Sequence, residues 1–89
     1  MGGPAWIYIL RGASGRHYIG LTQDLERRIN EHRGGSCHST RRLGGEITLV
    51  AERRCASLEE ARALERRLKR MKNPAAAIAF VLGRSSPRL

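Results

Sequence analysis

The fold is decided by residues 6–21, which read WIYILRGASGRHYIGL. Residues 6–10 are apolar or aromatic, which is the composition of a β-strand. The glycines and serine of residues 11–15 are turn signals, and residues 17–21 suit the returning strand of a hairpin. Because side chains alternate across a strand, Trp6, Tyr8 and Leu10 share one face of the first strand, and Tyr18 shares a face with Gly20. The stretch predicts a hairpin with a tyrosine on each strand.

Signals for a helix and a third strand follow the hairpin. Thr22 can cap a helix that runs to about Arg33, where Gly34-Gly35 ends it. Residues 36–45 are expected to form a polar loop. Residues 47–51 are rich in β-branched side chains and suit a third strand.

The last part of the chain predicts two more helices. Residues 57–60 form a capping box, which opens a helix that reaches about Lys72. Asn73 is a good N-cap and Pro74 a good first residue for a final short helix, which ends at Gly83. The expected order is β-β-α-β-α-α, an α+β domain over residues 1–83 with a flexible tail at 84–89.

The net charge points to an anionic partner. The chain has 89 residues, and 17 Lys and Arg against 8 Asp and Glu give it a formal charge of +9. Such a charge on one small domain favours nucleic acid or an anionic membrane. The longest apolar run, residues 75–82, is far too short to span a bilayer, and the N-terminus has no secretory signal. We therefore expect a cytoplasmic protein with no membrane partner.

The cysteines give a weaker signal. Cys37 and Cys55 lack C-x-x-C spacing and are expected to be reduced thiols. A zinc site made of His32, Cys37, His38 and Cys55 is an alternative, but these residues lack the usual ligand spacing.

Helical spacing turns two polar residues of the first helix toward its buried side. Leu25, Arg28, Ile29 and His32 lie three and four residues apart and so share a face, whereas Arg27 points elsewhere. The two apolar members mark that face as the one against the sheet. Arg28 has a solvated, snorkelling alternative. For His32 the alternative is an interaction with the last carbonyls of the helix.

Glu65 is the acidic residue that helix structure explains least. The apolar stripe of its helix consists of Leu58, Ala61, Leu64, Leu68 and Met71, and Glu65 borders that stripe. Its ordinary alternative is an exposed pair with Lys69. The cations between Arg66 and Lys72 are either a solvated face or a surface that faces phosphate.

These residues resemble a known family. The motifs are Ile7-Tyr8, Tyr18-Ile19-Gly20, Thr22-x-Asp24-Leu25-x-x-Arg28-x-x-x-His32 and Ala61-x-x-x-Glu65-x-x-Leu68-Lys69. In this order they resemble the GIY-YIG nuclease superfamily, and most closely its small stand-alone bacterial members. The resemblance implies a small antiparallel three-stranded sheet flanked by helices.

The resemblance also implies an activity and its residues. Members cut phosphodiester bonds in DNA with one divalent ion, Mg²⁺ or Mn²⁺, and need no small-molecule cofactor. The implied catalytic residues are Tyr8, Tyr18, Arg28, His32 and Glu65, with Glu65 as the metal ligand, Arg28 on the phosphate and Tyr8 as base. The candidate DNA-binding cations are Arg27, Arg41, Arg42, Arg66, Lys69 and Arg70.

Three positions depart from the family pattern. Trp6 replaces the first motif glycine, Leu21 stands where some members carry lysine, and Asn73 comes too early to match a distal asparagine. The expected function is a metal-dependent DNA endonuclease, with structure-specific cutting in repair or recombination as the family's setting. The alternatives are a binding module of the same fold that does not cut, and a basic structural protein such as a ribosomal component.

Overall fold

The computed structural model describes residues 3–33 and 46–83. The elements are β1 (Ala5–Gly12), β2 (His17–Thr22), α1 (Leu25–Arg33), β3 (Ile47–Cys55), α3 (Leu58–Met71) and α4 (Pro74–Val81). This order agrees with the prediction. The predicted helix stop at Gly34-Gly35, the loop over 36–45 and the tail over 84–89 lie outside the described residues.

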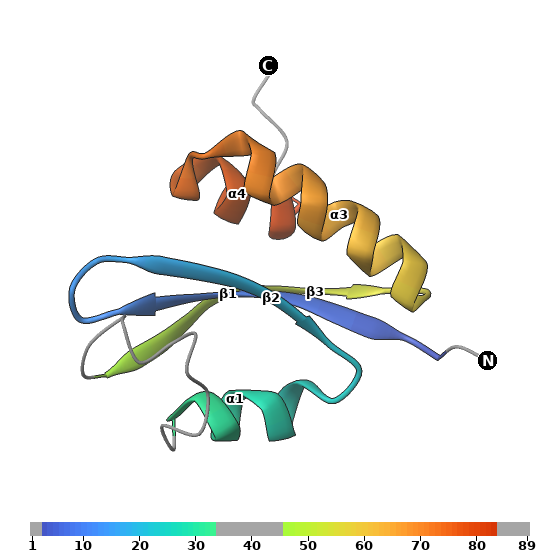
Figure 1. Cartoon of the computed structure of the whole chain (residues 1–89), viewed down its shortest axis with the longest axis horizontal. Helices are drawn as coiled ribbons and strands as arrows, with labels where there is room; N and C mark the ends of the chain where they lie inside the picture. The colour runs from blue at the N-terminus through green and yellow to red at the C-terminus, as the bar shows by residue number, and fades with distance from the viewer. Residues whose placement is uncertain (1–2, 34–45, 84–89) are drawn as a thin grey trace.

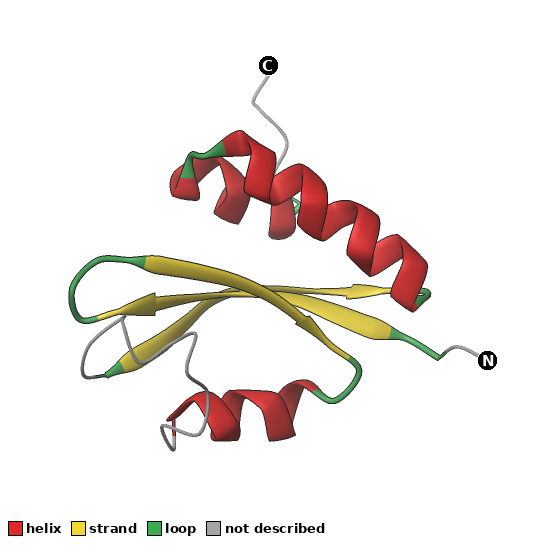
Figure 2. Cartoon of the chain, in the orientation of Figure 1, coloured by secondary structure: helices red, strands yellow, loops and turns green. Residues whose placement is uncertain are grey.

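The three strands form one antiparallel sheet with β1 in the middle. One face of the sheet carries α1, and α3 and α4 cover the other (Figures 1 and 2). β1 serves both layers because its side chains alternate. Ile7 and Ile9 enter the core beneath α3 and α4, whereas Tyr8 and Leu10 enter the core beside α1. Among the described helices, none has the length and hydropathy to cross a bilayer.

The start of α1 and the end of β3 differ from the prediction. The N-cap of α1 is Asp24 and not Thr22, because the Asp24 side chain accepts a hydrogen bond from the Arg27 N–H at 3.2 Å. Thr22 instead closes a local turn, in which its hydroxyl accepts from the Asp24 N–H at 3.0 Å. β3 runs on to Cys55 because residues 52–55 pair with the start of β1, although they lack the apolar pattern of a strand.

The last two helices begin as predicted. Ser57 accepts from the Glu60 N–H at 3.1 Å, and Asn73 accepts from the Ala76 N–H at 3.2 Å. The predicted stripe of α3 packs on the core, with Ala61 and Leu68 fully buried. α4 ends at Val81, two residues before the predicted Gly83.

Candidate active site

Three rings from three elements meet on the α1 side of the sheet. Tyr8 of β1 and His32 of α1 are 0% and 1% exposed, and Tyr8 Oη lies 2.8 Å from His32 Nε2. Tyr18 of β2 completes the cluster, with its ring centroid 6.2 Å from that of Tyr8 and 5.2 Å from that of His32. The structure therefore brings together three of the predicted site residues. The His32 ring is held in the core and not at an exposed helix end.

Gly20 makes room for this ring cluster. It pairs directly with Tyr8 across β1 and β2. A Cβ at Gly20 would lie 2.5 Å from the Tyr8 Cζ and Oη atoms and 2.9 Å from Tyr18 Cε2. Real Cβ atoms do not approach other atoms so closely, and Tyr8 is too deeply buried to move aside. The glycine is needed for space.

The environment of His32 favours its neutral form. Burial lowers the pKa of His32 below its ordinary value, and the positive charge of Arg28 lowers it further against an opposing effect of Glu31. A neutral imidazole has one acceptor nitrogen. With Nε2 in that role, the Tyr8 hydroxyl donates to His32.

Arg28 lies at the rim of the ring cluster, with its side chain 36% exposed. Its Nη1 lies 2.8 Å from Glu31 Oε1, and the more exposed Arg27 places Nε 3.4 Å from Glu31 Oε2. The hydrogen bond from Arg28 is the main reason that the pKa of Glu31 is lowered. Sequence reasoning missed Glu31, although its spacing of three and four residues from the two arginines was the available signal.

Glu65 lies on the helix that covers the other face of the sheet. α3 packs on β1 and β2, and α1 lies on the other face, so the sheet lies between the helix of Glu65 and the helix of Arg28. The Glu65 side chain is 23% exposed, and its Oε2 lies 3.3 Å from Lys69 Nζ. The predicted pairing alternative for Glu65 is thus present. The pair is at the surface, where it contributes little to stability.

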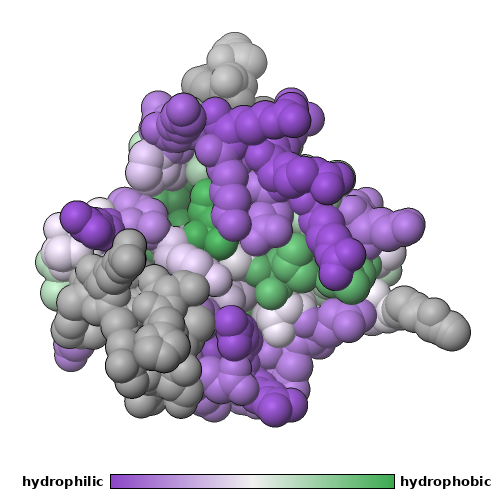
Figure 3. All heavy atoms as spheres, viewed as in Figure 1, coloured by the Kyte–Doolittle hydropathy of each residue, from purple (hydrophilic) through white to green (hydrophobic). Residues whose placement is uncertain are grey.

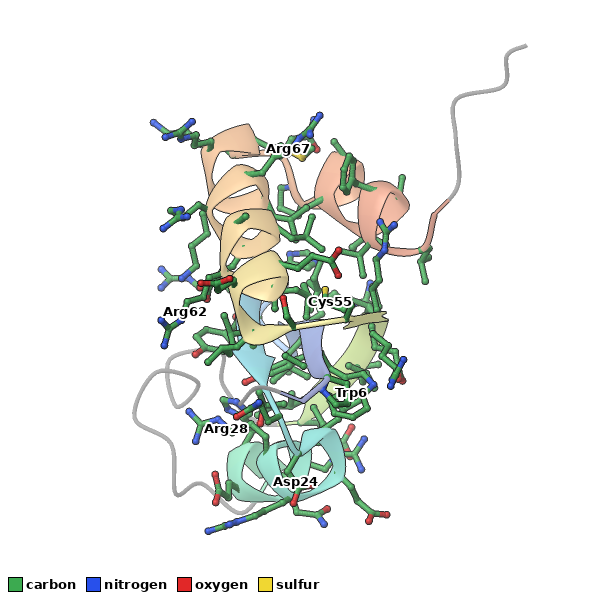
Figure 4. All side chains as sticks on the ribbon, turned by 90° about the vertical axis from the view of Figure 1, so that its right-hand side faces the viewer. Trp6, Asp24, Arg28, Cys55, Arg62 and Arg67 are labelled. Atoms are coloured by element: carbon green, nitrogen blue, oxygen red, sulfur yellow. The ribbon has the colours of Figure 1, made fainter. Side chains whose placement is uncertain are left out.

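Cations from both helix layers flank this edge of the sheet. Figure 4 shows Arg28 of α1 and Arg62 of α3 pointing to the same side of the molecule, the side of β2. Arg62 is exposed and was not among the predicted DNA contacts. Of those that were, Arg27, Arg66, Lys69 and Arg70 are exposed, whereas Arg41 and Arg42 lie outside the described residues. Figure 3 shows the resulting hydrophilic surface over α3.

The carboxylate of Glu65 suits a divalent ion that keeps most of its water. Within the described parts of the chain, no three His, Cys, Asp or Glu side chains come together as a metal cage. Mg²⁺ needs few protein ligands, because it keeps several waters and binds phosphate oxygens. The zinc alternative fails on geometry, because His32 lies on the α1 side and Cys55 lies in the core on the opposite side of the sheet. Cys37 and His38 lie outside the described residues.

Comparisons with known proteins identify the family of the chain. A family model of the GIY-YIG catalytic domain matches residues 4–77. A UPF0213 protein of Pectobacterium carotovorum is 39% identical over 69 residues, which are 76% of this chain and 70% of the relative. A UPF0213 protein of Yersinia pestis is 38% identical over 65 residues, covering 73% of this chain and 68% of the relative.

A solved structure matches as well. The solution NMR structure of a UPF0213 protein from Bacillus halodurans has a TM-score of 0.56 and 31% identity, covering 94% of this chain and 88% of that one. These matches confirm the resemblance and the fold predicted from the sequence. The chain therefore belongs to the GIY-YIG family, whose catalytic domain is of the endonuclease type.

Proposed function

We propose that this protein is a metal-dependent endonuclease that hydrolyses phosphodiester bonds in DNA. The observation that carries the proposal is the buried 2.8 Å hydrogen bond between Tyr8 and His32. The Tyr18 ring packs beside the His32 ring, and the charge of Arg28 acts on His32. Burying two polar rings costs free energy that apolar side chains of similar volume would not. A purely structural core gives no reason to keep them.

Burial divides the roles of the two tyrosines. Tyr8 is fully buried, whereas Tyr18 is partly exposed. The partial exposure of Tyr18 supports its assignment as the phenol that would reach an attacking water and assist its deprotonation. Tyr8 and His32 act from behind it as positioning residues that fix the Tyr18 ring, a change from the sequence expectation that made Tyr8 the base.

Arg28 and Glu65 supply the charges on either side of β2. Arg28 binds the scissile phosphate, since a guanidinium fork donates two hydrogen bonds to phosphate oxygens. Glu65 would hold the divalent ion, Mg²⁺ or Mn²⁺, and would then give up its ion pair with Lys69. The bound ion would neutralise charge on the phosphate and assist the leaving oxygen.

The test is cleavage of plasmid, single-stranded and branched DNA with Mg²⁺ or Mn²⁺. We expect Tyr18→Phe, Arg28→Ala and Glu65→Gln each to lower the rate by about 100-fold or more, the effect typical of losing a group that stabilises the transition state. Arg54→Ala is the control, because Arg54 is exposed on β3, at the edge of the sheet opposite β2, and belongs to none of the proposed sites. Full activity in Glu65→Gln would mean that a contaminant cuts the DNA.

The second candidate is a DNA-binding module that does not cut. The charge of +9 supports it, because charge alone gives binding to DNA. Binding that needs no metal, with no product under any metal, would favour it over the nuclease. The role that we propose for the nuclease is structure-specific cutting in repair or recombination. Its proposed location is the cytoplasm, where bacteria such as those of the relatives keep their DNA.

A further inference from the structure

A hollow of about 400 Å³ lies between the edge strand β2 and the turn that joins α3 to α4. We call it the β2 pocket. Its floor is apolar. Four elements contribute to it: β1 with Ile9, β2 with Ile19, α3 with Leu68 and α4 with Ala77. In Figure 3 hydrophobic side chains show below α3 and are framed by hydrophilic ones. A volume of this size is in the range of small-molecule sites.

The rim of the β2 pocket is positively charged. Lys69 and Lys72 line it together with His17, and no acidic residue is among the lining side chains. An apolar floor with cations at the rim matches a ligand that has a flat apolar body and an attached anion. A nucleotide has this chemistry, with its base and its phosphate.

The β2 pocket shares Tyr18 with the proposed active site and includes the ion-pair partner of Glu65. Tyr18 lines the pocket and also contacts the His32 ring, at 5.2 Å between centroids. On the α3 side, Lys69 lines the pocket and pairs with Glu65 at 3.3 Å. A nucleotide in the pocket would therefore lie beside Tyr18 and beside the carboxylate that we propose as the metal ligand.

Lys72 gives a second reason to expect a ligand. It follows the last residue of α3 with φ of 52°, and no other described residue apart from glycine has a positive φ. Glycine is the usual residue at such a helix end, since a side chain adds strain there. The lysine thus occupies a position that helix geometry alone would give to glycine, and it is one of the residues that line the pocket.

We propose that the β2 pocket receives one unpaired nucleotide of the DNA substrate, with its base on the apolar floor and its phosphate between Lys69 and Lys72. The inference rests on the proposed function and narrows its substrate to DNA with an unpaired nucleotide beside the cut. A base inside a duplex is stacked and paired, so it enters a pocket only at a cost that an unpaired base largely avoids. The chain has few aromatic residues on which bases could stack. An aliphatic floor would bind the base without aromatic stacking.

The experiment measures equilibrium binding in EDTA by fluorescence anisotropy. The probes are a fully paired duplex, the same duplex with one unpaired adenine, and a third duplex whose unpaired position is abasic. Wild-type protein should bind the unpaired-adenine duplex at least about fivefold more tightly than the abasic one, the lower range for one bound base. Equal affinity for these two duplexes would overturn the proposal.

The variant Lys72→Gly locates the effect. Glycine suits φ of 52°, so the variant should fold at least as stably as wild type, which thermal unfolding checks. It should reduce the fivefold preference toward one, and Lys72→Arg should retain it. Arg54→Ala is the matched control, because it removes one charge from β3 at the opposite edge of the sheet and should preserve the preference. Equal weakening of all three duplexes by Lys72→Gly would overturn the proposal.

Binding in EDTA separates this inference from the nuclease proposal. If the protein prefers the unpaired adenine but cuts no DNA with any metal, the β2 pocket proposal is supported and the nuclease proposal is wrong. If the protein cuts DNA but shows no preference for the unpaired adenine, the nuclease proposal is supported and the β2 pocket proposal is wrong.

Discussion

Gly20 and the two tyrosines depend on one another at the level of single atoms. Gly20 adopts backbone angles open to any residue, so its value is the space it leaves for the Tyr8 phenol. The Tyr8 phenol in turn reaches His32, whose pKa is lowered by burial. A change at any of these positions therefore disturbs the others.

We expect Gly20→Ala to destabilise the protein by about 1–3 kcal/mol, the usual cost of overpacking a core. The added methyl would meet the Tyr8 Cζ and Oη atoms at 2.5 Å. Urea denaturation measures the change in the free energy of unfolding. Gly3→Ala is the control, since nothing lies within 4 Å of a Cβ at that position. Equal stability of both variants would contradict the steric argument.

His32 should make the fold sensitive to acid. An unfolded chain protonates histidine near pH 6.5, and the folded chain does so only at lower pH because the pKa of His32 is lowered. Between these values the unfolded state binds more protons, so the free energy of unfolding falls as the pH drops, by up to about 1.4 kcal/mol per pH unit. Stability is full above pH of about 6.5.

The measurement is urea denaturation at several pH values between 7.5 and 5. His32→Gln should flatten the dependence, whereas His17→Gln, outside the ring cluster, should follow wild type. The acidic groups are common to all three proteins and cancel in the comparison. An unchanged slope in His32→Gln would show that another group governs it.

At the scale of elements, α1 carries three functions on neighbouring turns. Ile29 and His32 face the sheet, Arg28 lies at the rim, and Glu31 binds both Arg28 and Arg27. If Arg28 binds the phosphate as proposed, Glu31 would compete with it for the same guanidinium group. Its carboxylate would hold Arg28 in place before DNA binds and weaken binding afterwards.

We expect Glu31→Gln to tighten DNA binding by about 1.5- to 5-fold, the range that corresponds to one exposed ion pair. Anisotropy at constant salt gives the affinity. Glu26→Gln removes a negative charge from the first turn of the same helix and controls for net charge. If the two variants bind DNA alike, the competition at Arg28 does not matter.

At the scale of the whole molecule, the positive charge is spread over both layers that flank β2. Exposed arginines on α3 extend the surface that begins with Arg28 and Arg62 (Figure 4). DNA bound along this surface would release counterions for each phosphate that the protein neutralises. The salt dependence of binding therefore reports which cations touch the DNA.

We expect the double variant Arg66→Ala/Arg70→Ala to reduce the slope of log K against log salt by about 1.8, or about 0.9 for each phosphate that an arginine no longer neutralises. Arg11→Ala/Arg54→Ala removes the same charge from exposed positions on β1 and β3 and should change the slope less. Titrations from about 50 to 200 mM salt cover the informative range. Equal slopes for the two variants would mean that DNA does not follow α3.

Local chemistry accounts for the parts of the fold that were predicted well. Ser57, Asn73 and Pro74 act through hydrogen bonds and ring geometry within one helical turn, so their sequence neighbours suffice to predict them. The end of β3 and the cap of α1 were predicted wrongly. Residues 52–55 are strand because β1 supplies partners, and Asp24 displaced Thr22 because the chain turns once more before α1.

The sequence by itself determined the order of elements, the tyrosine on each hairpin strand, the inward face of α1 and the family. Only the tertiary structure showed that Tyr8 is fully buried whereas Tyr18 is partly exposed, and that Gly20 leaves space for the Tyr8 ring. It also showed that Glu31 pairs with Arg28 and that Lys72 lines a pocket beside β2. The physical reason is range. Strand alternation, helical spacing and capping act between near neighbours in the chain, whereas burial and contact depend on how distant segments pack around β1.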